Sequence, residues 1–336
     1  MTSITLPLLD DLHVHLREGD MLSNVIQETI NGGVGRVMAM PNLKNPLTTA
    51  DKVQEYQNYI KSLNLDLEIL YSLYLGQDTT PEEIVKAAKL GVKNVKMYPA
   101  GVTTNSNFGV SDITSFYLVF EAMQENDFIF NIHGEVPSDY GRNICVMNAE
   151  AKFLPILAEI QKNFPKLKIV LEHMTSAEAV EYVKNCDSEY LAASITVHHL
   201  DLVVDDWAGK IHNFCKPVAK FPVDRQALRD IVKSGNPKFF LGSDSAPHMR
   251  ELKETACGCA GVYTAPYLAP YLADVLERIG CLDRLVDFAT VFGAQFYGLE
   301  PQKKTFILTK KPTVVDSEIH GVVPFRAEET LSWGIE

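Results

Sequence analysis

Apolar runs of strand length recur along the chain, and segments with helical spacing separate them. Most of these runs are continuously apolar, a pattern typical of parallel strands that are covered on both faces. We predict eight strands, near residues 8–16, 34–40, 67–75, 92–97, 128–132, 168–172, 191–197 and 238–242.

The segments between the predicted strands carry helix start and stop signals. Residues 80–83, Thr-Pro-Glu-Glu, offer a capping threonine, a first-turn proline and a capping-box glutamate, and Gly91 is suited to end that helix. Thr175 with Glu178 repeats the capping box after the sixth strand. Residues 223–232 show the apolar spacing of an amphipathic helix.

Strands that alternate with helices in this way predict an α/β fold, a (β/α)8 TIM barrel. The competing fold is a doubly wound open sheet, in which the glycines of residues 32–35 would form a nucleotide-binding loop. Those glycines precede a strand instead of following one, so a helix C-cap and turn is the better interpretation.

The pattern changes after Tyr297, where residues 305–310 and 321–325 resemble short strands. We therefore expect a single domain: a barrel over about 8–297 and a short β-containing C-terminal tail over about 298–336 that packs on it.

Composition narrows the class of protein. With 46% hydrophobic and 22% charged residues, the chain is typical of soluble globular proteins. A net charge of −12 without a basic stretch argues against a nucleic-acid partner. We see no secretory signal at the start and no apolar run that could cross a membrane. Six scattered cysteines fit reduced thiols, so we expect a cytoplasmic protein.

The most informative polar stretch is residues 11–17, Asp-Leu-His-Val-His-Leu-Arg. Strand alternation would place Asp11, His13, His15 and Arg17 on one side. Two imidazoles at i and i+2 can bind one metal ion, although such a pair is weak evidence alone, because histidine is also common in cores and on surfaces.

Further side chains with ligand chemistry stand where other predicted strands end, and in a barrel all these ends surround one mouth. They are Asn42, Lys96, His133, His173, His198, His199 and Asp244. Together they predict a metal centre. Lys96 is the least expected member, since lysine is rarely buried and an ammonium group would be repelled by a dication. Spacing alone predicts only a dinuclear hydrolase.

Other candidates have weaker context. Cys257-Gly-Cys259 lacks a second cysteine pair, so we do not expect a metal there. Asp11 is expected to orient an imidazole. His198 and His199 could support the site or simply pack, and His212 and His320 are expected to be solvated.

Several motifs resemble the amidohydrolase superfamily and, within it, the dihydroorotases of the monofunctional, shorter-chain type. They are residues 11–17, Met40-Pro-Asn-Leu43, Lys96-Met-Tyr-Pro-Ala100, Thr103-Thr-Asn105, His133-Gly-Glu135, Glu172-His173, Gly242-Ser-Asp-Ser-Ala-Pro-His248 and Cys257-Gly-Cys-Ala-Gly261. The resemblance covers nearly the whole chain, and the last two motifs are specific to that group.

The resemblance implies two Zn²⁺ ions per subunit. His13, His15 and Asp244 would bind one ion, His133 and His173 the other, and Lys96, carbamylated to N6-carboxylysine, would bridge them. A metal-bridging hydroxide would act with Asp244 as general acid and base.

The resemblance also implies the substrate contacts. Arg17, Asn42 and His248 would hold the substrate carboxylate, and Ala260 would contribute backbone contacts. Residues 99–109 are suited to a mobile lid that brings Thr103 and Thr104 to the substrate, although a passive surface loop is the alternative. Lys216 stands where some relatives carry leucine, which puts a role for its side chain in doubt.

The implied reaction is the reversible cyclisation of N-carbamoyl-L-aspartate to L-dihydroorotate in pyrimidine biosynthesis, by a cytoplasmic homodimer. Two alternatives remain: a hydantoinase or allantoinase type of cyclic-amide hydrolase, and a non-catalytic scaffold. The three-residue carboxylate grip argues against the first, and the complete ligand set argues against the second.

Overall fold

A computed structural model describes residues 2–103, 106 and 109–336 of the chain. Within this part, eight parallel strands pair in sequential order. They are β2 (Leu9–Val14), β3 (Val34–Ala39), β4 (Glu68–Tyr74), β5 (Asn94–Met97), β6 (Ile129–Ile132), β7 (Lys168–Leu171), β8 (Leu191–Ile195) and β9 (Phe239–Leu241). The eight predicted strands are confirmed, with ends that differ by at most two residues.

The last strand returns to the first and nearly closes the barrel. Beyond β9, the Asp244 amide donates to the His13 carbonyl at 2.8 Å, and the His15 amide donates to the Ser245 carbonyl at 3.0 Å. Val14 and Ser245 form a parallel bridge between the two segments. The predicted (β/α)8 barrel is thus confirmed, and a doubly wound open sheet is excluded.

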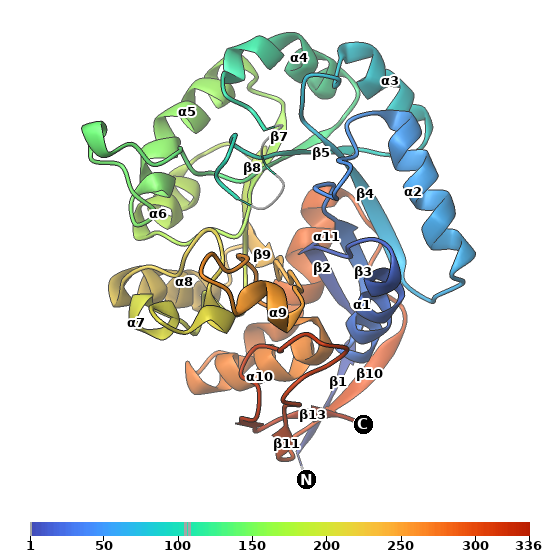
Figure 1. The fold of residues 1–336 in the computed structure, drawn as a ribbon, viewed down its shortest axis with the longest axis vertical. Helices are drawn as coiled ribbons and strands as arrows, with labels where there is room; N and C mark the ends of the chain where they lie inside the picture. The colour runs from blue at the N-terminus through green and yellow to red at the C-terminus, as the bar shows by residue number, and fades with distance from the viewer. Residues whose placement is uncertain (1, 104–105, 107–108) are drawn as a thin grey trace.

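Helices connect the strands and surround them, as Figure 1 shows. They are α1 (Asp20–Asn31), α2 (Ala50–Ser62), α3 (Pro81–Lys89), α4 (Tyr117–Glu125), α5 (Ala149–Asn163), α6 (Ala177–Asn185), α7 (Val204–Trp207), α8 (Pro222–Ser234), α9 (Arg250–Lys253), α10 (Leu268–Arg278) and α11 (Phe292–Tyr297). Gly32 caps the end of α1, and Gly33, with φ of 88°, lies in the turn before β3, as predicted, whereas Gly35 belongs to β3 itself.

The predicted caps are correct in one case and displaced in the other. Thr80 caps α3, and its side chain accepts a hydrogen bond from the Glu83 amide. Helix α6 is capped by Ser176 and not by Thr175. The buried Glu150 carboxylate accepts hydrogen bonds from the Thr175 and Ser176 amides, and this tertiary contact fixes the chain one residue further along than the local pattern indicates.

Apolar side chains fill the end of the barrel at which the strands begin. Leu12, Met38 and Phe240 belong to a buried cluster inside the barrel, and aromatic residues of α11 pack against it. A Cβ atom on Gly293 would lie only 2.3 Å from Leu12 Cδ1, so the close approach of α11 requires glycine at this position. Because this end is closed by apolar packing, polar functional side chains can gather only at the opposite end, where the strands terminate.

The tail forms its own small sheets. Strand β10 (Thr305–Thr309), predicted at 305–310, pairs antiparallel with β1 (Ser3–Pro7), which was not predicted, and with β13 (Gly334–Ile335). The tail also contains β11 (Thr313–Val314), paired with β12 (Thr330–Leu331). Both ends of the chain therefore belong to one sheet at the edge of the molecule, as Figure 1 shows.

The strand predicted at 321–325 is wrong. Ile319 and Val322 exchange both backbone hydrogen bonds across a tight turn in which Gly321 has a φ of 80°. Val322 and Phe325 are buried because the turn packs on the barrel, which explains the apolar residues that resembled a strand.

Among the described helices, none is both long and apolar enough to span a lipid bilayer.

Candidate active site

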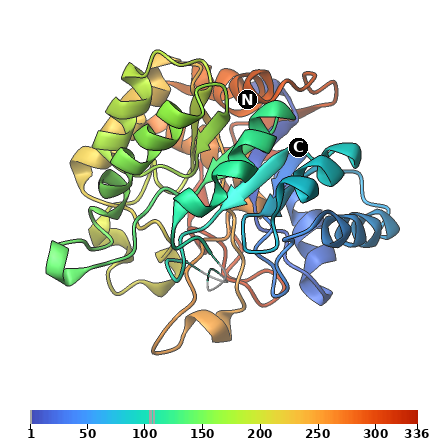
Figure 2. The same ribbon diagram turned by 90° about the horizontal axis from the view of Figure 1, so that it is seen from above.

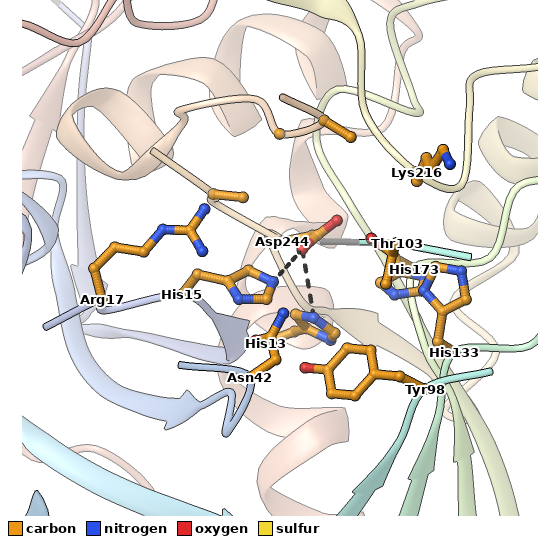
Figure 3. Close-up of a pocket in the computed structure, with 13 residues that line it drawn as sticks. His13, His15, Arg17, Asn42, Tyr98, Thr103, His133, His173, Lys216 and Asp244 are labelled. Atoms are coloured by element: carbon orange, nitrogen blue, oxygen red, sulfur yellow. Dashed lines mark hydrogen bonds and ion pairs between the residues drawn. The ribbon is translucent and has the colours of Figure 1, made fainter. Parts of the chain in front are cut away.

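Three side chains converge at the mouth of the barrel. Two come from the end of the first barrel strand, β2, and one comes from the segment just after the last, β9. His15 Nε2 lies 3.0 Å from Asp244 Oδ1, and His13 Nε2 lies 3.4 Å from the same oxygen. The candidate ligand atoms of these three residues all lie within 4.8 Å of one another. Figure 3 shows the two imidazoles directed at the carboxylate.

Strand alternation does not explain the whole 11–17 stretch. Strand β2 ends at Val14, and Arg17 has a φ of 68°, in the left-handed region. The expectation that alternation alone places Arg17 beside the histidines is therefore wrong. Arg17 reaches the pocket through a turn after the strand, as does Asp244, which has a φ of 47° and lies three residues beyond β9.

A second group lies next to the first. The His173 ring is centred 4.8 Å from that of His13 and 4.7 Å from that of His133. Lys96, on β5, has no exposed surface, and its charge interacts with those of His13, His173 and Asp244. The structure thus brings together all six side chains that the resemblance named as ligands.

Buried carboxylates hold two of these imidazoles from behind. Glu172 Oε2 lies 2.9 Å from His13 Nδ1, and Glu135 Oε2 lies 2.8 Å from His133 Nε2. The roles of these glutamates were missed, although Glu135 and Glu172 are close in sequence to His133 and His173. Such carboxylates fix the orientation of a ligand imidazole and increase its basicity.

Asp11 has a different role from the one expected. Its carboxylate accepts hydrogen bonds from the Ser243 amide at 2.8 Å and the Ser243 hydroxyl at 2.5 Å, and it does not hold an imidazole. Asp11 therefore anchors the backbone that presents Asp244.

The electrostatics suit metal binding. Burial lowers the pKa of His13 and His173 well below the usual value, so both imidazoles are neutral at neutral pH. Burial would raise the pKa of Asp244, but the hydrogen bond with His15 and the nearby positive charges lower it to about 2. Burial also lowers the pKa of Lys96 to about 8. Neutral imidazoles and an ionised carboxylate are the ligand forms of these groups.

Several buried polar atoms here have no hydrogen-bond partner in the described part of the chain. They include His13 Nε2, His173 Nδ1 and Lys96 Nζ. Because buried polar atoms are normally paired, these atoms indicate a missing binding partner. Imidazoles with a carboxylate match the ligand preferences of zinc, and the donor set fits divalent cations.

A cavity opens beside this group. Its lining comprises His13, His15, Arg17, Asn42, Tyr98, Thr103, His133, His173, Lys216, Asp244, Ala246, Ala260 and Gly261. Arg17 Nη2 lies 3.0 Å from His248 Nε2, which is also 3.1 Å from the Ala260 carbonyl oxygen. The guanidinium supplies positive charge at the end of the cavity away from His133, as Figure 3 shows.

Lys216 connects two sides of the cavity. Its Nζ donates a hydrogen bond to the Val102 carbonyl at 2.7 Å, beside Thr103. Thr104, the other predicted lid contact, lies outside the described residues.

The remaining histidines lie outside the cavity. His199 contacts the Thr196 hydroxyl at 2.8 Å and the Pro217 carbonyl oxygen at 3.0 Å, so both ring nitrogens have partners. His198, His199 and Cys215 also lie close enough to hold a metal ion, but a metal would have to displace these contacts. His212 and His320 lie beside Glu254 and Glu28, at 2.9 Å and 3.3 Å.

The chain is similar to known proteins along nearly its whole length. The family model described as "Amidohydrolase family" matches residues 4–305. The chain is 48% identical to a probable dihydroorotase of Schizosaccharomyces pombe, covering 98% of each chain, and 42% identical to the dihydroorotase of Saccharomyces cerevisiae, covering 99% of this chain and 98% of that one. A crystal structure of dihydroorotase from Saccharomyces cerevisiae in complex with 5-fluoroorotic acid has a TM-score of 0.94 at 43% identity, covering 100% of this chain and 99% of that chain.

Proposed function

The chain belongs to the amidohydrolase family, among its dihydroorotases, and on that premise we propose that it is a zinc-dependent enzyme of pyrimidine biosynthesis that reversibly cyclises N-carbamoyl-L-aspartate to L-dihydroorotate. The observation that carries the proposal is one cavity with the buried histidines and Asp244 at one end and the Arg17 guanidinium at the other. A substrate with an amide and a free carboxylate suits both ends.

The ligands proposed for the two ions are His13, His15 and Asp244 for one, and His133 and His173 for the other. When bound, the ions supply an activated water and polarise the carbonyl that it attacks. Lys96 is proposed to bridge them as a carbamate. Its amine adds to carbon dioxide and releases a proton, and the lowered pKa of Lys96, about 8, favours the neutral amine that this addition needs.

Asp244 is the proposed general acid and base. In ring opening, water oxygen adds to the ring carbonyl carbon, and the bond between that carbon and the ring nitrogen breaks. Asp244 takes a proton from the water and delivers it to the departing nitrogen; ring closure reverses these transfers and releases water. The hydrogen bond with His15 lowers the pKa of Asp244, which keeps the carboxylate ionised and able to act as a base.

Arg17, Asn42 and His248 are proposed to bind the free carboxylate, with backbone contacts from Ala260. The planar guanidinium can form two parallel hydrogen bonds with a carboxylate. In a chain of net charge −12, this local positive charge is what allows an anionic substrate to bind. Thr103 lines the same cavity and is a further proposed contact.

The proposal is tested by measuring turnover of dihydroorotate, hydantoin and allantoin on one preparation of known zinc content. We expect turnover of dihydroorotate, with zinc at two ions per chain, and poor turnover of the substrates that lack the carboxylate. A preference for hydantoin or allantoin would favour the second type of cyclic-amide hydrolase, and a zinc-loaded protein inactive on all three would favour a scaffold.

Assembly and location are further parts of the proposal. The family likeness supports a homodimer, and the cysteines, which are all unpaired in the structure, fit the cytoplasm. Light scattering on the purified protein would test the dimer, since a monomeric mass at micromolar concentration would contradict it.

A further inference from the structure

Tyr98 is a buried residue of the cavity that the proposed chemistry does not use. It stands two residues after Lys96, so both side chains project from the same side of the chain at the end of β5. The residue is only 2% exposed, and it lines the cavity. Its hydroxyl has no hydrogen-bond partner among residues 2–103, 106 and 109–336.

The ring is held in place on several sides. It stacks on the Tyr74 ring, with centroids 5.2 Å apart and an interplanar angle of 26°. Its backbone carbonyl accepts a hydrogen bond from the Val110 amide at 2.8 Å, and Lys96 Nζ lies 5.0 Å from the ring centroid. A side chain fixed in this way cannot turn to find a partner, so the hydroxyl is prepared for a group that enters the cavity.

The direction of the hydroxyl identifies that group. In Figure 3 it points away from His133 and toward the side on which Asn42 and His13 are drawn, and these residues line the same cavity. Asn42 belongs to the proposed carboxylate grip. We propose that the Tyr98 hydroxyl donates a hydrogen bond to the free carboxylate of the substrate, an inference that rests on the proposed function.

The chemistry of the two donors is complementary. Arg17 supplies charge and two parallel donors, whereas two carboxylate oxygens together accept about four hydrogen bonds. Tyr98 adds a neutral donor without adding a second charge. A ring that lacks the carboxylate leaves the buried hydroxyl unpaired, so Tyr98 also contributes to selectivity for acidic substrates.

The test compares Tyr98→Phe with Tyr297→Phe as a matched control. The Tyr297 hydroxyl donates to Asn131 Oδ1 at 2.6 Å, and its ring packs on the apolar cluster inside the barrel, away from the cavity. For each purified holoenzyme we would measure KM and kcat for dihydroorotate, the affinities for orotate and uracil by calorimetry, zinc content, intact mass and the unfolding midpoint.

For Tyr98→Phe we expect kcat/KM for dihydroorotate to fall about tenfold to a hundredfold, mostly through KM, as for loss of a hydrogen bond to a charged group. The affinity for orotate should fall by a similar factor, while the affinity for uracil, zinc content and mass stay unchanged. The unfolding midpoint should not fall, because the hydroxyl has no hydrogen-bond partner to lose in the part of the chain that the structure describes. Tyr297→Phe should lower the midpoint and leave KM unchanged.

An unchanged KM and an unchanged orotate affinity in Tyr98→Phe would overturn the inference. Loss of zinc, or of the mass of one carbon dioxide, would also overturn it, because the hydroxyl would then serve Lys96 or the ions. Absence of dihydroorotate turnover in the unaltered enzyme would instead overturn the proposed function, so the two failures are distinguishable.

Discussion

Individual backbone conformations place much of the candidate site. Arg17, His173 and Asp244 have φ values of 68°, 39° and 47°, in the left-handed region that side chains other than glycine occupy at a cost. All three line the cavity. The sharp turns that follow β2, β7 and β9 therefore direct functional groups inward, which continued strand geometry could not do.

Asp244→Asn tests the proton transfer. Asparagine keeps the size and one ligand oxygen but cannot accept a proton, so we expect turnover to fall at least about a hundredfold. Zinc content should remain close to that of the unaltered enzyme. Steady-state rates and metal analysis on the same sample provide the measurement, and substantial residual turnover in the zinc-loaded variant would refute the assignment.

Arg17→Lys tests the carboxylate grip. Lysine keeps the charge but loses the planar fork, and it would also lose the contacts with the Pro247 carbonyl and His248. We expect KM for dihydroorotate to rise about tenfold or more, with a smaller change in kcat. Initial rates over a range of substrate concentrations give KM and kcat. An unchanged KM would show that Arg17 does not contact the substrate.

His198 provides a test of pH-dependent stability away from the cavity. Burial lowers its pKa to about 3, so below pH 6.5 the unfolded chain binds a proton that the folded chain does not. Its contribution therefore destabilises the fold progressively as pH falls from about 6.5 toward 3.

The variant His198→Leu removes this contribution. The unfolding free energy of the variant minus that of the unaltered protein should be about 2 kcal/mol larger at pH 5 than at pH 7.5. Each pH unit below about 6.5 contributes about 1.4 kcal/mol to this change. Urea unfolding at both pH values measures the difference. A difference that does not change with pH would show that the pKa of His198 is the same in the folded and the unfolded chain.

The residues that sequence analysis found and those it missed differ in a physical way. His13, His133 and Asp244 stand near the ends of apolar runs, and that position is visible in the sequence. The role of Glu172 depends on His13, which lies 159 residues away, and the role of Tyr98 depends on an unpaired hydroxyl. Only folding reveals contacts of that kind.

At the scale of elements, apolar runs identified the eight barrel strands because most of these strands are buried on both faces, although β4 begins at the exposed Glu68. Strand β1 was missed, since residues 3–7 are short and partly exposed and their partner β10 is about 300 residues away. The errors at 175 and 321–325 share one cause. Tertiary contacts of Glu150 and of the buried Phe325 override the local pattern.

Lys216→Met tests a contact between two connecting segments. Methionine fills similar space but loses the hydrogen bond to the Val102 carbonyl, so the segment that carries Thr103 should be held less firmly. We expect KM to rise several-fold with zinc content unchanged, whereas Lys210→Met, at an exposed position, should have no effect. Equal kinetics for the two variants would show that Lys216 is an ordinary surface residue.

At the scale of the whole molecule, the barrel and tail are expected to unfold as one unit. Trp333 of the tail is 1% exposed, and its indole nitrogen donates to Glu277 of α10 at 3.1 Å. Strand β10 joins β1, which leads directly into the first barrel strand. These contacts leave no separate core for the tail.

The two tryptophans of the chain allow a direct test. Trp207 lies in α7, within the barrel part, and Trp333 reports on the tail. In Trp207→Phe and Trp333→Phe, the remaining tryptophan should show an unfolding transition that coincides with the loss of helical signal in the same variant. If the tail unfolded at a lower denaturant concentration than the barrel, the two would be separate unfolding units. The circular dichroism of each variant provides the control for changes caused by the substitution.

The mouth and the chain ends lie in different places. Figure 2 shows the 250–260 segment, in orange, on the side of the molecule opposite the marked N-terminus. The sheet of β1, β10 and β13 can thus hold both ends without crowding the cavity. Its pairing across nearly the full length of the chain was the part of the architecture that local patterns could not indicate.

The left-handed residues at the mouth have a consequence for protein engineering. Glycine would relieve the backbone at positions 17, 173 and 244, and would also remove buried ionisable groups that are costly to desolvate. A library screened for heat resistance alone should therefore accumulate inactive members with changes at these three positions. Directed evolution of this scaffold must select for turnover in every round, because durability and catalysis favour opposite choices there.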